Sequence, residues 1–408
     1  MKKISIFGST GSIGTSTIDV VVRSPAADFK ILALTANNNF KLLAQQAIAV
    51  KAELAVIANQ AHYRDLKDLL AHTNIKVAAG ASGMDEACVM GNDLVVAGIV
   101  GSAGLRTVYN SIISGADIAL VNKESLVCAG AIMTEAAKKH KVNLIPTDSE
   151  HSAIFQVLER ENLDAIEKII LTASGGPFRN FTAKQLEHVT VEQAINHPKW
   201  KMGPKISADC ATMVNKGLEI IEAHYLFEMP AEKIEVLIHP QSIVHSIVAY
   251  KDGSSLAQMG NADMRIPISY ALYYPKRSKS YIAETLDLAR IGELQFTNPD
   301  RKLFPALNIC RQALASGAAH TIMLNASNEI AIENFLQGKI RFIDIVGVIE
   351  AMLAQTKDAD IASIEQVIEY DLTCREMTRE YLMFEKLSLQ GALATRQSTH
   401  THRRYGNT

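Results

Sequence analysis

Cysteine is scarce in this chain of 408 residues, and its five cysteines show no CxxC spacing. An odd, scattered set of cysteines argues against a disulfide framework or a structural zinc site and is typical of a reducing compartment. An excess of charge of one sign is also missing, because 41 basic and 43 acidic residues leave a net charge of −2. Such a chain has no electrostatic attraction to nucleic acid or to an anionic membrane, and we predict neither as a partner.

Long apolar runs are absent as well, since no stretch reaches the ~18 uninterrupted apolar residues of a membrane-spanning helix. The N-terminus, Met1-Lys2-Lys3-Ile4, leads directly into a strand-like segment, without the apolar core of a signal peptide or an Arg- and Ser-rich transit segment. The apolar share of 48% and charged share of 21% are those of an ordinary globular protein, with two or three domains at this length. These features predict a cytoplasmic protein.

Short apolar segments alternate with amphipathic ones over the first part of the chain. The segments expected as strands are 3–7, 30–34, 54–58, 75–78, 93–100, 116–121 and 141–146. The segments expected as helices are 12–23, 40–50, 63–71, 105–114 and 124–140. A strand that is apolar nearly throughout, such as 94–100, suits a sheet covered on both faces. The alternation predicts an α/β fold class, with a Rossmann-like, doubly wound parallel sheet in a domain of residues 1–148.

The regular alternation of strand-like and helix-like segments ends after Asp148. Residues 149–273 combine strand-like segments, a hairpin turn and one long helix expected over residues 209–227, which predicts a central α/β catalytic and dimerisation domain. The next segment, 274–304, is rich in proline and charge and is expected to be a linker. The segments 307–316, 327–337, 343–355 and 364–386 then predict a C-terminal helical bundle over residues 305–387. The tail, 388–408, shows no periodicity and is expected to be disordered.

A glycine-rich turn, Gly8-Ser9-Thr10-Gly11-Ser12-Ile13-Gly14, follows the first strand and opens the first helix. In this context glycines let the backbone approach a pyrophosphate, and the first amides of the helix bind anions. The spacing departs from the strict G-x-G-x-x-G pattern, so a bare turn is the alternative. The second strand ends at Asn37-Asn38-Asn39, without the carboxylate that NAD-specific sites place there. This favours NADP, with weak selectivity because no basic residue stands there either.

Acidic side chains follow the last expected strand of the first domain. Asp148 and Glu150 come directly after residues 144–146, at the carboxyl end of a strand, where open parallel sheets bind ligands. Glu219 joins them from a later helix, on which Asn215 shares its face. Three carboxylates favour Mg²⁺ or Mn²⁺ over zinc. Read alone, the first two acidic residues would be interpreted as helix-capping groups, and Glu219 is what favours a metal site.

A loop rich in glycine, proline and aromatic residues spans residues 174–204. A loop longer than ~15 residues within a domain is usually functional or disordered. Its glycine and proline hinges around Trp200, the only tryptophan, predict a lid that closes over a substrate and excludes water. A surface loop whose tryptophan packs on the core is the alternative.

Three further features are interpreted as structural. His239 and His245 lie within apolar strands and are expected to be satisfied core residues. The segment 325–329, Asn-Ala-Ser-Asn-Glu, is interpreted as the capped start of a helix.

Seven blocks of sequence between residue 1 and about residue 385 match the motifs of one known family in register. They are 8–14, 122–126, 146–151, 174–179, 197–203, 215–219 and 237–242. Together they resemble the family of 1-deoxy-D-xylulose 5-phosphate reductoisomerase, the enzyme of the non-mevalonate isoprenoid pathway that makes 2-C-methyl-D-erythritol 4-phosphate. Blocks of this length are rarely found together elsewhere, so the resemblance is specific.

The resemblance implies a homodimer that binds NADPH, Mg²⁺ or Mn²⁺, and a sugar phosphate. The implied reaction is a retro-aldol and aldol isomerisation followed by hydride reduction. The implied metal ligands are Asp148, Glu150 and Glu219, which with Lys123 form the catalytic set. The residues implied for substrate binding are Lys123, Ser149, Glu150, Ser174, His197, Trp200, Met202, Cys210, Asn215, Lys216 and Glu219. Those implied for NADPH binding are Gly8, Thr10, Gly11, Ser12, Ile13, Asn37, Asn38, Asn39, Asn122, Glu124 and Gly203.

Two positions depart from the family pattern. The family usually has serine where Cys210 stands, and a thiol is a weaker hydrogen-bond donor than a hydroxyl, so we expect weaker phosphate binding. The family often has glycine followed by lysine, arginine or serine where Asn37 and Asn38 stand, which leaves open how strongly NADPH is preferred over NADH.

Rival classes share some of these features. Semialdehyde dehydrogenases also open with such a glycine turn but need a nucleophilic cysteine paired with a histidine. The best-placed cysteine, Cys128, lies in an alanine-rich helix without such a partner nearby. A non-catalytic NADP-binding sensor would need no set of three carboxylates. A relative that acts on a neighbouring sugar phosphate is the remaining alternative.

Overall fold

A seven-stranded parallel sheet forms the N-terminal part of the molecule, with the strand order β4-β3-β2-β1-β5-β6-β7. The structure, a computed structural model, describes residues 1–200 and 202–402, with side chains described as far as residue 384. The strands are β1 Lys2–Phe7, β2 Phe29–Ala36, β3 Leu54–Ile57, β4 Lys76–Ala79, β5 Leu94–Ala97, β6 Asp117–Leu120 and β7 Leu144–Pro146. The predicted doubly wound parallel sheet is confirmed.

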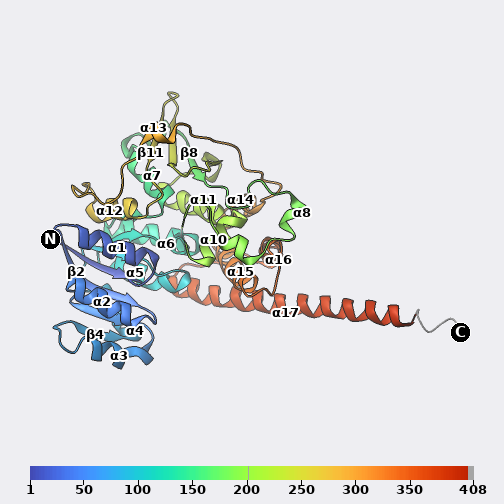
Figure 1. Cartoon of the computed structure of the whole chain (residues 1–408), viewed down its shortest axis with the longest axis horizontal. Helices are drawn as coiled ribbons and strands as arrows, with labels where there is room; N and C mark the ends of the chain where they lie inside the picture. The colour runs from blue at the N-terminus through green and yellow to red at the C-terminus, as the bar shows by residue number, and fades with distance from the viewer. Residues whose placement is uncertain (201, 403–408) are drawn as a thin grey trace.

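Helices alternate with these strands along the chain (Figure 1). They are α1 Ser12–Arg23, α2 Phe40–Val50, α3 Tyr63–Leu69, α4 Gly80–Cys88, α5 Leu105–Ile113 and α6 Glu124–His140. All residues of β3 and β5 are buried, as coverage of both faces requires. The sequence did not predict α4, because Gly80 and Gly83 disfavour a helix by their intrinsic propensity.

The direction in which strands are added reverses at β1, which pairs in parallel with β2 on one side and with β5 on the other. Open sheets bind ligands at the carboxyl ends of the strands beside such a reversal. Gly8 follows β1 with φ +78°, and a Cβ atom there would lie 2.7 Å from the carbonyl oxygen of Gly98, which follows β5. Only glycine fits this close approach. The predicted nucleotide-binding turn therefore lies where the fold offers a ligand site.

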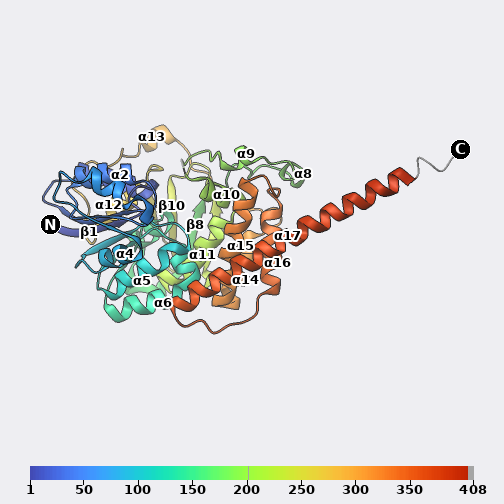
Figure 2. The ribbon, with the colours of Figure 1, turned by 90° about the horizontal axis from the view of Figure 1, so that it is seen from below.

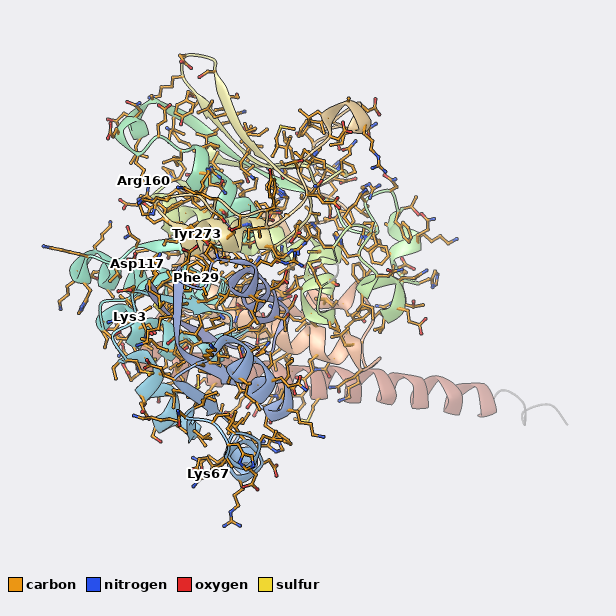
Figure 3. All side chains as sticks on the ribbon, turned by 60° about the vertical axis from the view of Figure 1, so that its left-hand side comes forward. Lys3, Phe29, Lys67, Asp117, Arg160 and Tyr273 are labelled. Atoms are coloured by element: carbon orange, nitrogen blue, oxygen red, sulfur yellow. The ribbon has the colours of Figure 1, made fainter. Side chains whose placement is uncertain are left out.

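A second sheet has the strand order β11-β10-β8-β9, in which β8 and β9 are parallel and the other pairs are antiparallel. Its strands are β8 Ile166–Ala173, β9 Ile234–Ile238, β10 Val244–Tyr250 and β11 Ser255–Met259. Helix α7, Ser149–Val157, leads into this sheet, and α12, Arg265–Tyr273, returns to the first one. The Tyr273 ring lies edge-on to Phe29 of β2 at 5.0 Å, and both residues are labelled in Figure 3. The Tyr273 hydroxyl donates to Asp28 at 2.6 Å.

The single helix predicted over residues 209–227 is wrong, because the structure has two. Helix α10 spans Pro204–Thr212 and α11 spans Val214–Phe227. Met213 between them has φ 64°, a left-handed conformation that is uncommon for a residue other than glycine. No glycine or proline marks this break in the sequence. The break gives α11 its own N-terminus, with Asn215 and Lys216 in the first turn.

The C-terminal region is helical, as predicted. Its helices are α14 Ala306–Ser316, α15 Ala318–Leu336, α16 Asp344–Gln355 and α17 Ile364–His402. The predicted helix start at 325–329 is wrong, because α15 begins just after Gly317 and buries Asn325 and Asn328 in mid-helix. Asparagine is common at the start of helices, but both of these asparagines are buried in the middle of one.

The tail, residues 388–408, was expected to be disordered, and this expectation stays a prediction. Helix α17 continues to His402 and extends past the other helices in both views (Figures 1 and 2). Leucine, glutamine, alanine and arginine in this stretch are good helix formers, a property that hydrophobic periodicity does not register. Residues 403–408 lie outside the described residues.

The predicted linker and lid contain only short helices among their described residues. These are α8 Ala183–Leu186 and α9 Val191–Ile195 in the lid and α13 Leu288–Ile291 in the linker. Short 3₁₀-helices span Gln60–His62, Ser102–Gly104, Arg160–Ala165 and Ala231–Lys233. The division of the chain into domains stays a prediction. Among the described residues, no helix is both long and apolar enough to cross a membrane.

Helix α11 packs tightly on α14. The sulfur of Cys310 on α14 lies so close to Gly217 on α11 that no Cβ atom would fit at that position. Buried side chains of both helices belong to one continuous hydrophobic core. The C-terminal helices therefore support the helix that carries Lys216 and Glu219.

Candidate active site

A cavity of about 190 Å³ opens where the two sheets, the lid and α11 meet. Every residue predicted for metal or substrate binding lines it, together with Ser12 and Ile13 of the glycine turn and Gly203 at the end of the lid. The fold brings these segments together because α6 and α7 begin at the carboxyl ends of the neighbouring strands β6 and β7. The sequence motifs therefore converge on one site.

The three predicted metal ligands lie close together. Carboxylate oxygens of Asp148, Glu150 and Glu219 all lie within 4.8 Å of one another. Asp148 occupies the N-cap position of α7, yet its side chain makes no cap hydrogen bond to the helix. Helix capping therefore does not explain the position of its carboxylate. Three hard oxygen donors fit a Mg²⁺ or Mn²⁺ ion.

Two lysines lie among these carboxylates. The Lys123 ammonium is 2.9 Å from Asp148 Oδ2 and donates to Asn215 Oδ1 at 2.8 Å. The Lys216 ammonium donates to Glu150 Oε1 at 2.7 Å and to Glu219 Oε2 at 2.5 Å. Two ammonium groups against three carboxylates leave a net negative charge for a cation to balance.

Protonation in this cluster follows from burial and charge. Burial alone would lower the pKa of Lys216, but the carboxylates of Glu150 and Glu219 raise it above its ordinary value. Burial, and then the charge of Glu150, raise the pKa of Glu219. Burial would also raise the pKa of Asp148, but Lys123 lowers it well below its ordinary value. Lys216 therefore remains a cation that can face a phosphate.

The two ends of the lid are joined by a hydrogen bond. His197 Nδ1 accepts from the backbone amides of Lys199 at 3.2 Å and Trp200 at 2.9 Å, so it carries no proton. Its Nε2–H group therefore donates to Ser174 Oγ, at 2.8 Å. The Trp200 ring lies 6.2 Å from the ring of His245. The first and last parts of the lid are thus held over the cavity by a neutral imidazole.

We predict that acid disturbs the lid through His197. Burial lowers the pKa of His197 below its ordinary value, so the ring is neutral at neutral pH. Its bonds are therefore complete at high pH and are lost as pH falls through the lowered pKa, when a proton enters Nδ1. Because Trp200 is the only tryptophan, intrinsic fluorescence reports on the lid. We expect a change between about pH 7 and about pH 5 in the wild type, and none with His197→Gln.

The matched control for this titration is His188→Gln, at an exposed position in the lid, which should leave the fluorescence change intact. His245 is a second candidate, because it lies beside Trp200 and burial lowers its pKa as well. A change that persists in His197→Gln and disappears in His245→Gln would contradict the prediction.

Several residues predicted for NADPH binding have side chains already bonded within the protein. Asn122 donates from Nδ2 to the carbonyl oxygens of Ile99 and Gly101, at 2.7 and 2.8 Å. Asn39 accepts from the amide of Leu42 and caps α2, and Asn38 accepts from Asn59 at 2.8 Å. Gly8, Thr10, Gly11, Asn37, Asn38, Asn39, Asn122 and Glu124 do not line the cavity. Their cofactor contacts stay predictions.

Sequence reasoning missed Lys205, which follows the lid. Its ammonium lies 3.2 Å from Glu124 Oε1 and 3.0 Å from Asp209 Oδ2. Asn328 on α15 donates to the other oxygen of Asp209 at 2.7 Å. The only sequence signal was the i,i+4 spacing of Lys205 and Asp209. This cluster ties the end of the lid to the nucleotide domain and to the C-terminal helices.

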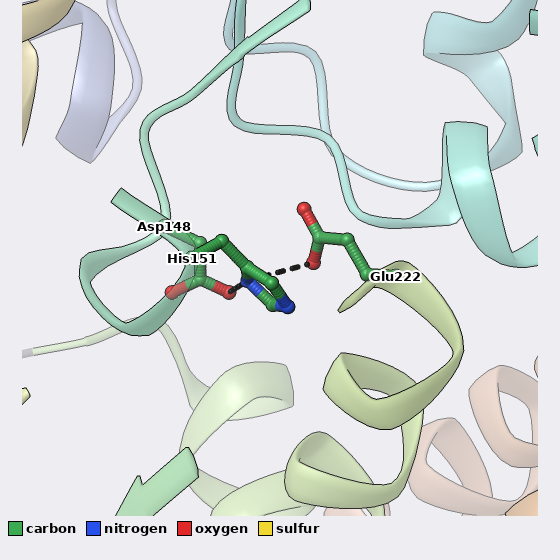
Figure 4. A group of neighbouring side chains, drawn as sticks. All are labelled: Asp148, His151 and Glu222. Atoms are coloured by element: carbon green, nitrogen blue, oxygen red, sulfur yellow. Dashed lines mark ion pairs between the residues drawn. The ribbon is translucent and has the colours of Figure 1, made fainter. Parts of the chain in front are cut away.

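Sequence reasoning also missed a second group of metal-type side chains that shares Asp148. Atoms of Asp148, His151 and Glu222 lie within 4.8 Å of one another (Figure 4). Burial raises the pKa of Glu222, and Glu222 in turn raises the pKa of His151 against the opposing effect of burial. The i,i+3 spacing of Glu219 and Glu222 on α11 was the available signal.

The histidines predicted to be core residues are buried, at 0% exposure for His239 and 6% for His245. His239 is fully satisfied, because Nε2 accepts from the amides of Ile243 and Val244 and Nδ1 lies 2.8 Å from the carbonyl oxygen of Gln295. His245 differs in that it also lines the cavity.

The fold and the site together define an α/β protein with a dinucleotide-type sheet and a carboxylate set suited to a divalent cation. Three family profiles match the chain: 1-deoxy-D-xylulose 5-phosphate reductoisomerase over residues 4–130, its C-terminal domain over 144–227, and the DXP reductoisomerase C-terminal domain over 259–377. The chain belongs to the 1-deoxy-D-xylulose 5-phosphate reductoisomerase family.

Individual relatives agree along nearly the whole chain. The reductoisomerase of Wolbachia pipientis is 47% identical over 386 residues, which cover 94% of this chain and 98% of the relative. A solved reductoisomerase of Zymomonas mobilis in complex with NADPH is 45% identical, with a TM-score of 0.89 and coverage of 93% and 99%. A DOX-P reductoisomerase solved with NADPH, fosmidomycin and magnesium is 38% identical, with a TM-score of 0.90 and coverage of 95% and 99%.

Proposed function

We propose that this chain converts 1-deoxy-D-xylulose 5-phosphate to 2-C-methyl-D-erythritol 4-phosphate, using NADPH and a divalent metal ion, in isoprenoid precursor biosynthesis. The observation that carries the proposal is one cavity that gathers three carboxylates and two lysines beside the glycine turn. Full-length relatives that bear this enzyme's name, two of them solved with NADPH, support it. The enzyme is accordingly an oxidoreductase that also isomerises its substrate.

Each group in the cavity has a proposed role. Asp148, Glu150 and Glu219 would hold Mg²⁺ or Mn²⁺, which when bound supplies Lewis acidity at substrate oxygens. Lys216 is a buried cation in the first turn of α11, where free amides and a positive charge suit a phosphate. Lys123 bridges the carboxylates and Asn215, between the nucleotide turn and the substrate.

The lid has the proposed task of excluding water from the reacting carbons. Ser174 and His197, which are bonded to each other across its two ends, would also contact the substrate. Trp200 and Met202 line the cavity and would cover the substrate once it is bound. Water excluded in this way cannot quench reactive intermediates.

We also propose a homodimer in the cytoplasm. The strand β11 has a partner only on one side among the described residues, and Leu256 on it is 40% exposed. An edge strand of this kind can pair with a second copy, which light scattering would test. All five cysteines lie in the described part of the chain and are free thiols, as a reducing compartment requires.

The experiment that tests the proposed reaction is NADPH oxidation by the purified chain with 1-deoxy-D-xylulose 5-phosphate. We expect turnover with Mn²⁺ or Mg²⁺ and none with EDTA. Repeating the assay with NADH measures the cofactor preference that Asn37 and Asn38 leave open. A folded protein that binds NADPH but shows no turnover with either metal would overturn the proposed substrate.

The thiol at Cys210 should weaken phosphate binding. Cys210 lies on α10 and lines the cavity, and burial raises its pKa, so it remains a neutral thiol. One weakened hydrogen bond costs about 1–3 kcal/mol, or roughly one to two decades in affinity. We expect Cys210→Ser to lower KM for the substrate by about tenfold or more with little change in kcat. An unchanged KM would contradict this prediction.

A further inference from the structure

Glu222 on α11 is a buried carboxylate that the proposed chemistry does not use. Its side chain is fully buried, and neither carboxylate oxygen has a hydrogen-bond partner among the described residues. Burying a carboxylate in this way is unfavourable unless another charge compensates it. The nearest compensating group is His151, whose Nδ1 lies 3.4 Å from Glu222 Oε2 (Figure 4).

His151 has a polar neighbour at each ring nitrogen, although Nδ1 makes no hydrogen bond among the described residues. Nε2 lies 2.9 Å from the backbone carbonyl oxygen of Glu219, and because a carbonyl only accepts, Nε2 carries a proton. Nδ1 faces two carboxylates, Glu222 Oε2 at 3.4 Å and Asp148 Oδ2 at 3.7 Å. The ring also stacks on Phe227, with 6.4 Å between ring centroids. The imidazole therefore stands between Glu222 and Asp148, as Figure 4 shows.

Neither Glu222 nor His151 lines the cavity, as far as the described residues define it. Both lie behind the proposed metal ligands. His151 contacts the carboxylate of Asp148 and the backbone of Glu219, so one ring touches two of the three ligands. The same oxygen of Asp148, Oδ2, also lies 2.9 Å from the ammonium of Lys123. Its carboxylate thus has one cationic neighbour in the cavity and one imidazole behind it.

We propose that Glu222 and His151 are positioning residues for the metal site: Glu222 fixes the imidazole, and the imidazole fixes Asp148 and the first turns of α11. The inference rests on the proposed function, because it takes Asp148 and Glu219 as metal ligands. Partners behind metal ligands orient them, and their loss typically lowers metal affinity or activity by about 10–100-fold. The row of side chains Glu222, His151 and Asp148 explains why a carboxylate is buried at position 222, which hydrophobic packing alone does not explain.

The test measures metal binding directly in the full chain. Mn²⁺ binding to Glu222→Gln, followed by the EPR signal of free Mn²⁺, should be weaker than in the wild type by about 10–100-fold. In turnover assays, the Mn²⁺ concentration for half-maximal activity should rise, and saturating Mn²⁺ should restore most of kcat with KM for NADPH unchanged. A merely structural role would lower kcat at every Mn²⁺ concentration. Glu228→Gln, at the exposed residue that follows the same helix, is the matched control and should bind Mn²⁺ normally.

A double variant tests whether Glu222 acts through His151. In His151→Gln, the new amide can still donate to the Glu219 carbonyl, but the contact with Glu222 is lost. Residues that act as one unit are not additive, so Glu222→Gln with His151→Gln should bind Mn²⁺ no more weakly than the weaker single variant. Fully additive losses would overturn the proposal.

The remaining outcomes separate this proposal from the proposed reaction. Turnover in the wild type with unchanged Mn²⁺ affinity in Glu222→Gln would overturn the positioning role alone. Mn²⁺ binding that depends on Glu222, without turnover of the sugar phosphate, would overturn the proposed reaction and support the positioning role. Two Mn²⁺ ions per wild-type chain and one in Glu222→Gln would overturn positioning by making Glu222 a ligand. A wild type that binds no Mn²⁺ would overturn it as well.

Discussion

Replacing Glu219 by glutamine should lower kcat/KM by about a thousandfold and leave the fold intact. A metal ion contributes several kcal/mol of transition-state stabilisation, and each ~1.4 kcal/mol is a factor of ten in rate. Stability should not suffer, because burial and Glu150 already disfavour the charged form of Glu219 and raise its pKa. Glutamine keeps an oxygen that can accept from the Lys216 ammonium.

This prediction is checked by steady-state kinetics across a range of Mn²⁺ concentrations, with thermal unfolding of the same preparations. Glu228→Gln, directly after the same helix with 66% exposure of the side chain, should retain wild-type values of both. Wild-type turnover in Glu219→Gln would remove this residue from the proposed ligand set. A large fall in Tm would mean that the hydrogen bonds its carboxylate accepts from Asn215 and Lys216 contribute to stability as well.

Replacing Lys205 by methionine should destabilise the protein by about 3 kcal/mol, because breaking a buried ion pair leaves an uncompensated charge. Lys205 is the ammonium that meets both Glu124 and Asp209, whose side chains are 5% and 2% exposed. Burial alone would lower the pKa of Lys205, but Asp209 and Glu124 raise it, so the group is charged. Methionine preserves most of the volume and removes only the charge.

Urea unfolding curves measure this effect, with Lys139→Met as the control at an exposed position of α6. Adding Glu124→Gln to Lys205→Met should restore part of the lost stability. Without Lys205, the carboxylates of Glu124 and Asp209 are both buried without a cation, and the second substitution makes one of them neutral. If Lys205→Met unfolds at the same urea concentration as Lys139→Met, the buried cluster does not contribute to stability.

The local pattern of apolar and polar residues is enough to predict the strands and helices that bring the site residues together. Strands of a parallel sheet end at one edge, so residues that follow β6 and β7 must meet whatever their distance in the chain. For this reason Lys123, Asp148 and Glu150, which follow these two strands, line the same cavity. Glu219 is harder to place, because its position depends on the packing of a later helix, and only its carboxylate and the shared helix face with Asn215 marked it as a candidate.

Other features depend on tertiary contacts that leave little trace in local sequence. Met213 adopts a left-handed conformation between two helices, and its neighbours are compatible with one continuous helix. The polar residues of α15 resemble a cap because nothing local shows that Asn328 bonds to Asp209, 119 positions away. Glu222 and Lys205 were missed for the same reason, since His151, beside Glu222, and Glu124, beside Lys205, come from other helices.

The contact between Gly217 and Cys310 makes the shape of the cavity depend on a residue that does not line it. Helix α11 carries Lys216 and Glu219 into the cavity, while Gly217 leaves no space between this helix and α14. A larger residue at position 310 would push α11 and narrow or tilt the cavity without touching any bound molecule. Substitutions in the C-terminal helices would therefore alter the cavity, and a survey confined to the cavity lining would overlook them.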